Sequence, residues 1–277
     1  MIGLDASNVN AEALFRLRLP LVDFAILKAT EGLTFVDPFR PTRAAQVRAL
    51  GKALGFYHFD RSNDDGISQA RFFVRIADPQ PGDTLWLDME TADAQSWATV
   101  AGRAADFLRT VGTLTGAKCG LYSDRSELVA VIAAADPVQR TLLEAAPLWF
   151  ADPSHAQGHP SCPLPWAIHQ YGSAGGLDAN VTNPAFVWAA MAVPGSHPAP
   201  TPAPTPIPPT PLPTPAPSDP KESAVLLFQD STGIYFLTGA GTVHVPSVAD
   251  VALLRSLGVP FANPLSDAFG TSLRGTP

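Results

Sequence analysis

Two carboxylates lie two residues apart near the end of an apolar run, Asp88 and Glu90 in the sequence TLWLDMET of residues 84–91. If the run is a β-strand, the two side chains share a face and their Cα atoms lie roughly 6.6 Å apart. Asp88 can then stay ionised while its charge, with apolar surroundings, raises the pKa of Glu90. The spacing favours a general acid beside a charged partner. The alternative is a strand end whose acids cap the next helix or pair with a lysine.

Three more acids lie at or near the C-terminal ends of predicted strands. One is the fourth residue of IGLDA, one follows FAILKAT, and one lies in LDAN; they are Asp5, Glu31 and Asp178. In barrels of parallel strands the chemistry takes place at the rim where the strands end. We therefore expect these side chains to gather around Asp88 and Glu90.

The elements that must position these acids alternate between strand and helix along the first half of the chain. Apolar runs predict strands at 2–6, 22–30, 53–59, 84–91 and 120–123. Helical spacing of apolar residues predicts helices at 41–50, 67–77, 96–114 and 126–135. Three strands without intervening helices and a last helix follow, at 148–151, 166–171, 177–180 and 185–192. Eight strands with helices among the first five predict an α/β fold, a TIM-like (β/α)5(β)3 barrel with an incomplete helical jacket.

Length and composition limit the kinds of partner that the chain can have. At 277 residues and 46% hydrophobic content, the chain is long enough for one large core and a second small unit. A net charge of −7 and a pI near 5.3, without a basic stripe, argue against nucleic acid. The two cysteines, Cys119 and Cys162, are far apart and in no metal spacing, so we expect neither a metal nor a cofactor. No run is long enough for membrane insertion and no signal peptide is recognisable, so we expect synthesis in the cytoplasm.

A proline-rich segment divides the chain into a catalytic barrel, 1–193, a linker, 194–220, and a C-terminal module, 221–277. The linker holds 13 of the 29 prolines, and polyproline II geometry would let it reach about 80 Å. An SH3-type ligand is the alternative interpretation. The module is predicted to be a small α+β unit, with strands at 224–228, 234–237 and 242–245 and a helix at 248–257. Because it is small, we expect it to bind a ligand or a second copy of itself.

Eight short motifs stand in order along residues 2–186: IGLDAS, FAILKATEG, GFYHF, QARFF, LDMET, WFAD, IHQYG and GLDANVTN. Together they resemble the glycoside hydrolase family 25 muramidases. The resemblance implies a (β/α)5(β)3 barrel that hydrolyses the β-1,4 bond between N-acetylmuramic acid and N-acetylglucosamine in peptidoglycan. The acids that match the family's catalytic positions are Asp5, Asp88, Glu90 and Asp178. Further matches look like substrate-binding or site-shaping positions: Glu31, Asp37, Tyr57, Tyr122, Gln170 and Tyr171.

The aromatic and basic side chains of the strands have two interpretations. Phe59, Trp149 and Trp166 can stack on sugars or merely fill the barrel, and we count Phe59 among the substrate-binding candidates. His58 and His169 are expected to be hydrogen-bonded core residues rather than bases, and Lys28 is expected to pair with an acid such as Glu31. The chain also departs from the family pattern. The Gln and Trp that often follow the first strand are absent from NVNAEALFRLRLP, and His169 stands where a Trp is common.

For the chemistry, Glu90 is the expected proton donor, and Asp88, Asp5 and Asp178 are expected to supply the negative charge that steadies an oxocarbenium-like centre. The second step can use a carboxylate nucleophile or the 2-acetamido oxygen of the substrate, and the resemblance favours the second, retaining route. With its long linker and no recognisable signal peptide, the chain resembles a phage endolysin, which would reach the cell wall through a holin. A catalytically inactive glycan-binding barrel with a structural or particle-associated tail remains the alternative.

Overall fold

The computed structural model describes residues 1–61, 64–173 and 176–195, together with four strands between residues 226 and 262. The chain divides into two compact units, Met1–Ala203 and Pro204–Pro277. In the described residues, no helix combines the length and the apolar character needed to cross a membrane.

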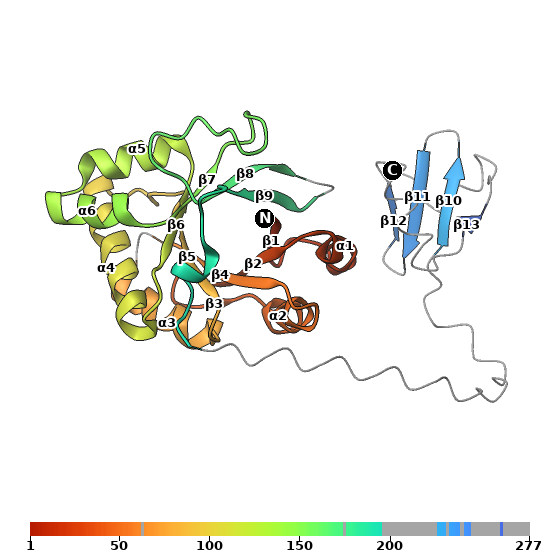
Figure 1. Ribbon diagram of the computed structural model, residues 1–277, viewed down its shortest axis with the longest axis horizontal. Coiled ribbons are helices and arrows are strands. Elements are labelled where there is room, and N and C mark those ends of the chain that lie inside the picture. The colour runs from red at the N-terminus through yellow and green to blue at the C-terminus, as the bar shows by residue number, and fades with distance from the viewer. Residues whose placement is uncertain are drawn as a thin grey trace. The chain divides into compact units, whose positions relative to one another are not determined.

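The first unit is a mixed α/β fold around a closed barrel of eight strands (Figure 1). Seven strands run parallel, and the last runs antiparallel between its two neighbours, so that it closes the barrel onto the first strand. In barrel order from the first strand the members are β1 (Ile2–Ala6), β2 (Phe24–Glu31), β4 (Ala53–Phe59), β5 (Thr84–Asp88), β6 (Gly120–Ser123), β7 (Leu148–Ala151), β8 (Ile168–Ser173) and β9 (Asp178–Thr182).

Large side chains fill the barrel interior, and glycines make room for them. Trp149 makes edge contacts with Tyr57, Trp86 and Tyr122, at ring centroid distances of 6.1, 5.8 and 4.6 Å. A Cβ atom on Gly120 would lie 2.3 Å from the ring of Trp86, so this position must be a glycine. The interior is therefore a packed core on which a site can be built only at the rim.

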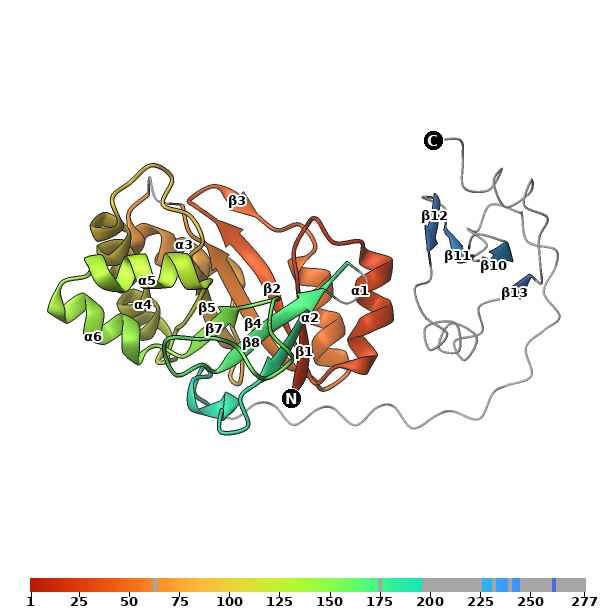
Figure 2. The same ribbon diagram turned by 90° about the horizontal axis from the view of Figure 1, so that it is seen from above.

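Helices follow each of the first five parallel strands (Figure 2) and cover the outside of the barrel with apolar faces. No helix follows β7 or β8 among the described residues, as the (β/α)5(β)3 pattern requires. Side-chain caps start several helices; Asp65, Ser96, Asp124 and Asp136 each accept hydrogen bonds from backbone N–H groups of the first turn. The helices are α1 (Glu12–Arg18), α2 (Arg40–Ala49), α3 (Gly66–Ala77), α4 (Trp97–Thr115), α5 (Arg125–Ala134) and α6 (Pro137–Ala145).

Several elements of the first unit differ from the sequence-based prediction. Helix α1 was not expected, because it has only seven residues and no side-chain cap. Helix α6 was also missed; it begins at Pro137, where the missing N–H of proline is harmless. The expected helix at 185–192 is only a 3-10 turn, Trp188–Ala190. The two-residue strand β3 (Phe35–Val36), which pairs with the end of β2, was missed.

Asp178 was expected near the C-terminal end of a strand, and this was wrong. It is the first residue of β9. Because β9 is antiparallel to β1 and β8, its start lies at the rim where its neighbours end. The carboxylate therefore reaches the expected rim from the opposite chain direction.

In the second unit the described residues form a four-stranded sheet in the order β12, β11, β10, β13. The first three strands are antiparallel, as predicted, and β13 is parallel to β10 and was not predicted. The strands are β10 (Leu226–Asp230), β11 (Gly233–Thr238), β12 (Gly241–His244) and β13 (Phe261–Ala262). The expected helix at 248–257 and the linker beyond residue 195 lie outside the described residues.

Candidate active site

The predicted acids lie at one end of the barrel. Asp5 is the fourth residue of β1 and Asp88 the last residue of β5, while Glu90 lies two residues beyond the end of β5. Asp178 pairs with Asp5 across β9 and β1. Asp5 and Asp88 are almost fully buried, with 8% and 6% of their surface exposed, whereas Glu90 and Asp178 are exposed. The rim therefore carries two buried and two accessible carboxyl groups.

Asp5 is held by two amide side chains. Its Oδ2 atom accepts hydrogen bonds from Gln170 Nε2 at 2.9 Å and Asn180 Nδ2 at 2.8 Å. Both amides are themselves oriented, since Tyr122 Oη donates to Gln170 Oε1 at 2.9 Å and Trp149 Nε1 donates to Asn180 Oδ1 at 2.8 Å.

Burial, followed by the charge of Asp178, raises the pKa of Asp5 to about 7, although the bonds from Asn180 and Gln170 oppose the rise. This carboxyl group therefore titrates near neutral pH.

Of the pair Asp88 and Glu90, Asp88 has the more strongly raised pKa. Burial raises its pKa well above the usual range, and the charges of Glu90 and Asp5 add to the rise. Its Oδ1 atom is buried without a hydrogen-bond partner among the described residues. We had expected Asp88 to stay ionised beside Glu90. The structure corrects this, because the acid at the strand end is the more deeply buried of the two.

The pKa of Glu90 is raised, and two acids that were not predicted from the sequence contribute to the rise. Partial burial is the largest cause, and the charges of Asp124 and Glu127 come next. Asp124 follows β6 and caps α5, and Glu127 lies in the first turn of that helix. The charge of Lys28 acts in the opposite direction and lowers the pKa of Glu90. The acid is therefore accessible and biased towards its protonated form.

Two tyrosines line the same cluster. Burial raises the pKa of Tyr57, and the charges of Asp88 and Asp5 add to it. The pKa of Tyr122 is raised by burial and by the same two carboxylates, with Glu90 and Asp178 contributing. Both phenols therefore remain protonated hydrogen-bond donors beside the acids.

Asp37 also contributes to the electrostatic environment of Tyr57. It is buried, and one of its oxygens accepts the Phe39 N–H at 2.8 Å.

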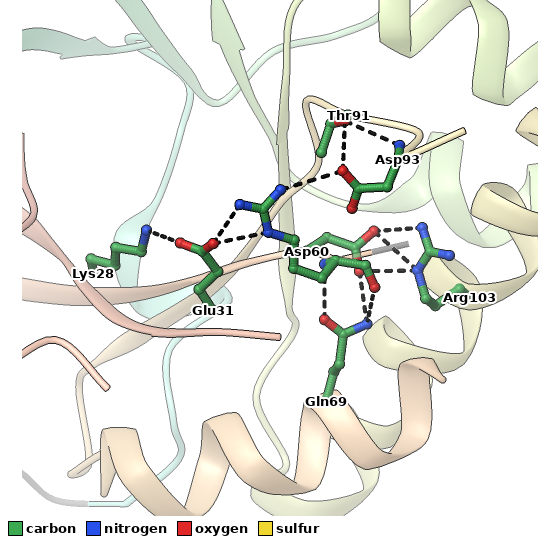
Figure 3. A network of polar contacts seen from close by, with 8 residues as sticks. Lys28, Glu31, Asp60, Gln69, Thr91, Asp93 and Arg103 are labelled. Carbon is green, nitrogen blue, oxygen red and sulfur yellow. Dashed lines mark hydrogen bonds and ion pairs between the residues drawn. The ribbon is translucent and has the colours of Figure 1, made fainter. Parts of the chain in front are cut away.

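A separate polar group lies at the ends of β2 and β4 (Figure 3). Lys28 Nζ lies 2.6 Å from Glu31 Oε2, which confirms the expected pairing of these two residues. Arg61 Nη2 contacts the other oxygen of Glu31, also at 2.6 Å. Both cations lie over the ring of Phe59, with Lys28 Nζ 4.9 Å and Arg61 Cζ 5.0 Å from its centroid. Glu31 is thus neutralised by two cations, unlike the other predicted acids.

Tyr171 lies at the edge of the carboxylate cluster, next to Asp178. Its ring lies beside that of His169, with a centroid distance of 6.0 Å, and only burial raises its pKa. With Leu4, Leu177 and Asp178 it borders a cavity of about 160 Å³. The neighbouring Gln170 points to Asp5 instead. Of the two adjacent candidates, Gln170 donates a hydrogen bond to Asp5, and Tyr171 shares a cavity wall with Asp178.

Several residues that shape this rim were not predicted from the sequence. Asp124 ends the motif KCGLYSD, so the signal that identified the other strand-end acids could have found it. Arg61 and the buried Asp60 follow β4 in a loop without a recognisable pattern. The two histidines match their expectation, since His58 and His169 are buried and hydrogen-bonded. In the described part of the chain no group of three or more metal-ligating side chains is placed to hold an ion.

Parts of this chain are similar to known proteins. The fold is similar to that of a muramidase from Trichobolus zukalii, with a TM-score of 0.60 and 24% identity over 69% of this chain and 98% of the other. It is also similar to a bacterial lysozyme from Streptomyces coelicolor, with a TM-score of 0.58 and 22% identity over 69% and 96% of the two chains.

The catalytic domain of the endolysin ply40, from a bacteriophage of Listeria monocytogenes, has a TM-score of 0.52 and 22% identity over 66% and 92%. At these identities the likeness establishes the fold.

Among curated proteins, the uncharacterized protein YegX of Escherichia coli K12 is 33% identical over 103 residues. The match spans 37% of this chain and 38% of YegX. A family model, glycosyl hydrolases family 25, matches residues 5–179. This range begins at Asp5, ends one residue after Asp178 and contains the whole carboxylate cluster. The chain belongs to glycosyl hydrolases family 25.

Proposed function

We propose that this protein is a muramidase that hydrolyses the β-1,4 bond between N-acetylmuramic acid and N-acetylglucosamine in peptidoglycan. The observation that carries the proposal is the meeting of Asp5, Asp88, Glu90 and Asp178 at one rim of a family 25 barrel. Glycoside hydrolysis needs a protonated carboxyl group for the leaving oxygen and negative charge beside the sugar ring. The four acids, two of them buried and two exposed, can supply both the protonated carboxyl group and the negative charge.

Glu90 is the proposed proton donor. It is exposed enough to reach a glycosidic oxygen, and its raised pKa keeps the proton available at higher pH than for an ordinary glutamate. In the first step the proton passes to the leaving oxygen while the bond between that oxygen and C1 breaks. In the second step Glu90 takes a proton from the water that attacks C1.

Asp88 is proposed to orient the 2-acetamido group of the substrate. Its unpartnered Oδ1 can accept the acetamido N–H, and this bond would favour the ionised carboxylate that burial disfavours. The acetamido oxygen would then bond to C1 as the leaving group departs, and water would open the resulting ring with retention of configuration. A direct bond from a carboxylate to C1 is the competing route.

The remaining candidates are proposed to hold the substrate. Asp5 and Asp178 would stabilise positive charge on the sugar ring, with Asp5 fixed by its two amide donors. The phenol of Tyr57 can donate to a carbonyl or hydroxyl oxygen of the substrate, whereas Tyr122 donates its proton to Gln170 and can accept a hydrogen bond from a substrate hydroxyl. The other candidates for substrate binding or site shaping are Glu31, Asp37, Phe59, Gln170 and Tyr171.

The biological setting is proposed to be phage-induced lysis. The linker of 194–220 and the module of 221–277 suit an endolysin whose tail binds the cell wall, and the effective concentration gained by tethering would favour attack on the polymer. The protein would be made in the host cytoplasm and reach the wall through a holin. Self-association through the module is the alternative role for the tail.

Mass spectrometry of the fragments released from purified peptidoglycan tests the proposal. A muramidase produces fragments with N-acetylmuramic acid at the reducing end. N-acetylglucosamine at the reducing end would instead indicate a glucosaminidase, and free peptide stems an amidase. Binding without any released fragment would favour the rival function, a glycan-binding barrel.

A further inference from the structure

The loop that follows Glu90 has an unfavourable backbone conformation. Asp93 and Ala94 have φ angles of +44° and +66°, in the left-handed region that residues other than glycine rarely adopt. Each such residue costs on the order of 1 kcal/mol or more and persists only where its surroundings hold it. Something must therefore fix the loop between Glu90 and the start of α4.

Arg61 makes the contacts that hold this loop. Its Nη1 atom lies 3.3 Å from Asp93 Oδ1, and the same oxygen accepts a hydrogen bond from Thr91 Oγ1 at 3.1 Å. The Asp93 N–H in turn donates to Thr91 Oγ1 at 3.1 Å. Thr91 is the residue directly after Glu90. Arg61 is therefore connected to the backbone of Glu90 through two side chains.

The other edge of the Arg61 guanidinium group is bound to Glu31, the last residue of β2. Its Nε and Nη2 atoms both contact Glu31 Oε1, at 2.9 and 2.6 Å, and Glu31 is held from its other side by Lys28. A planar guanidinium group can span two carboxylates in this way, while a lysine ammonium is a point charge that cannot keep both contacts. The contacts link the end of β2 to the loop after β5.

The residue before Arg61 supports the opposite flank of the same loop. The Asp60 N–H donates to the Asp88 backbone oxygen at 2.8 Å. Its carboxylate is buried against Arg103 of α4, with Nη2 2.7 Å from Oδ2. Asp60 and Arg61 thus contact the chain on both sides of Glu90. They differ in burial, since the Asp60 side chain is 1% exposed and the Arg61 side chain 45%.

We propose that Arg61 is a positioning residue for Glu90, acting through Asp93 and Thr91. This inference rests on the proposed function, in which Glu90 donates the proton. An ion pair as exposed as that of Arg61 adds little to the free energy of unfolding. The geometry of the loop, by contrast, determines where the carboxyl group of Glu90 lies, and small displacements of a catalytic group slow a reaction strongly.

The test uses the full-length protein with Arg61→Ala, Asp93→Ala and the double variant. We expect each single variant to lower kcat about 10- to 100-fold, with KM changed by less than about threefold, and the double variant to be no slower than the slower single variant. Arg61→Lys should not restore kcat. Arg109→Ala, which removes an exposed ion pair with Asp106 on α4, is the matched control and should keep full activity.

Hydrogen exchange of the backbone amides of residues 89–96 gives a readout that needs no activity. Exchange should accelerate in Arg61→Ala but not in Arg109→Ala, while the melting temperatures of both stay close to that of the wild type. Additive effects of the two single substitutions on kcat, or unchanged exchange, would overturn the role of Arg61. A wild type that releases no fragments from peptidoglycan would overturn the proposed function instead, and the exchange result would still decide whether Arg61 holds the loop.

Discussion

Asp5 and Asp178 are paired residues of the antiparallel strands β1 and β9, so the first and the last strand of the barrel bring two carboxyl groups together. After burial, the charge of Asp178 is the largest cause that raises the pKa of Asp5 to about 7. The closure of the barrel thus creates an electrostatic environment that neither strand has alone. Stability and activity should both depend on it.

Asp5→Asn should stabilise the protein in a pH-dependent manner. The pKa of Asp5 is about 7 in the folded protein and about 3.8 when unperturbed, so the wild type loses stability as the pH rises from about 4 to about 7. The variant lacks this titration. Its gain over the wild type should be near zero at pH 4 and reach on the order of 2–4 kcal/mol above pH 7. Urea unfolding of both proteins at several pH values measures this, and a gain that is constant with pH would contradict it.

Lys28→Met should move the high-pH limit of activity upward. The charge of Lys28 lowers the pKa of both Glu90 and Asp88, so its removal raises both. Because the proton donor must be protonated, activity would then persist to higher pH. Profiles of kcat/KM against pH for the variant and the wild type measure the displacement. Lys118→Met is the control, since Lys118 is exposed and borders a cavity beside the start of β7.

Asp124→Asn should move the same limit in the opposite direction. The charge of Asp124 is, after burial, the largest cause of the raised pKa of Glu90, so a neutral side chain lowers that pKa and activity is lost at lower pH. Asparagine preserves the cap of α5, because it can still accept the N–H groups of Ser126 and Glu127. Asp106→Asn, an exposed acid on α4, should leave the profile unchanged. Equal pH profiles for Asp124→Asn and the wild type would show that the charge of Asp124 does not raise the pKa of Glu90.

The barrel could be predicted from the sequence because its signals are local. Apolar runs such as that of β2 and strand-end acids such as Asp88 depend only on neighbouring residues, and the (β/α)5(β)3 pattern follows from their order. The direction of β9 could not be predicted in this way. It depends on the pairing of Asp178 with Asp5, a contact between the two ends of the barrel.

The predicted site was less complete than the predicted fold. Sequence spacing suggested that Asp88 and Glu90 perturb each other, but burial is the largest cause at both, and burial is a property of the folded chain. Asn180 and Arg61 act through contacts with Asp5 and Asp93, which belong to other strands and loops. Such partners have no fixed spacing in the sequence.

The release of reducing ends from purified peptidoglycan by Glu90→Gln tests the central claim most directly. Glutamine keeps the size of the side chain and removes the proton donor. We predict that release falls at least about 100-fold while the variant still cosediments with peptidoglycan as the wild type does. Release by Glu90→Gln at the rate of the wild type would contradict the assignment of Glu90 as the proton donor and, with it, the proposed mechanism.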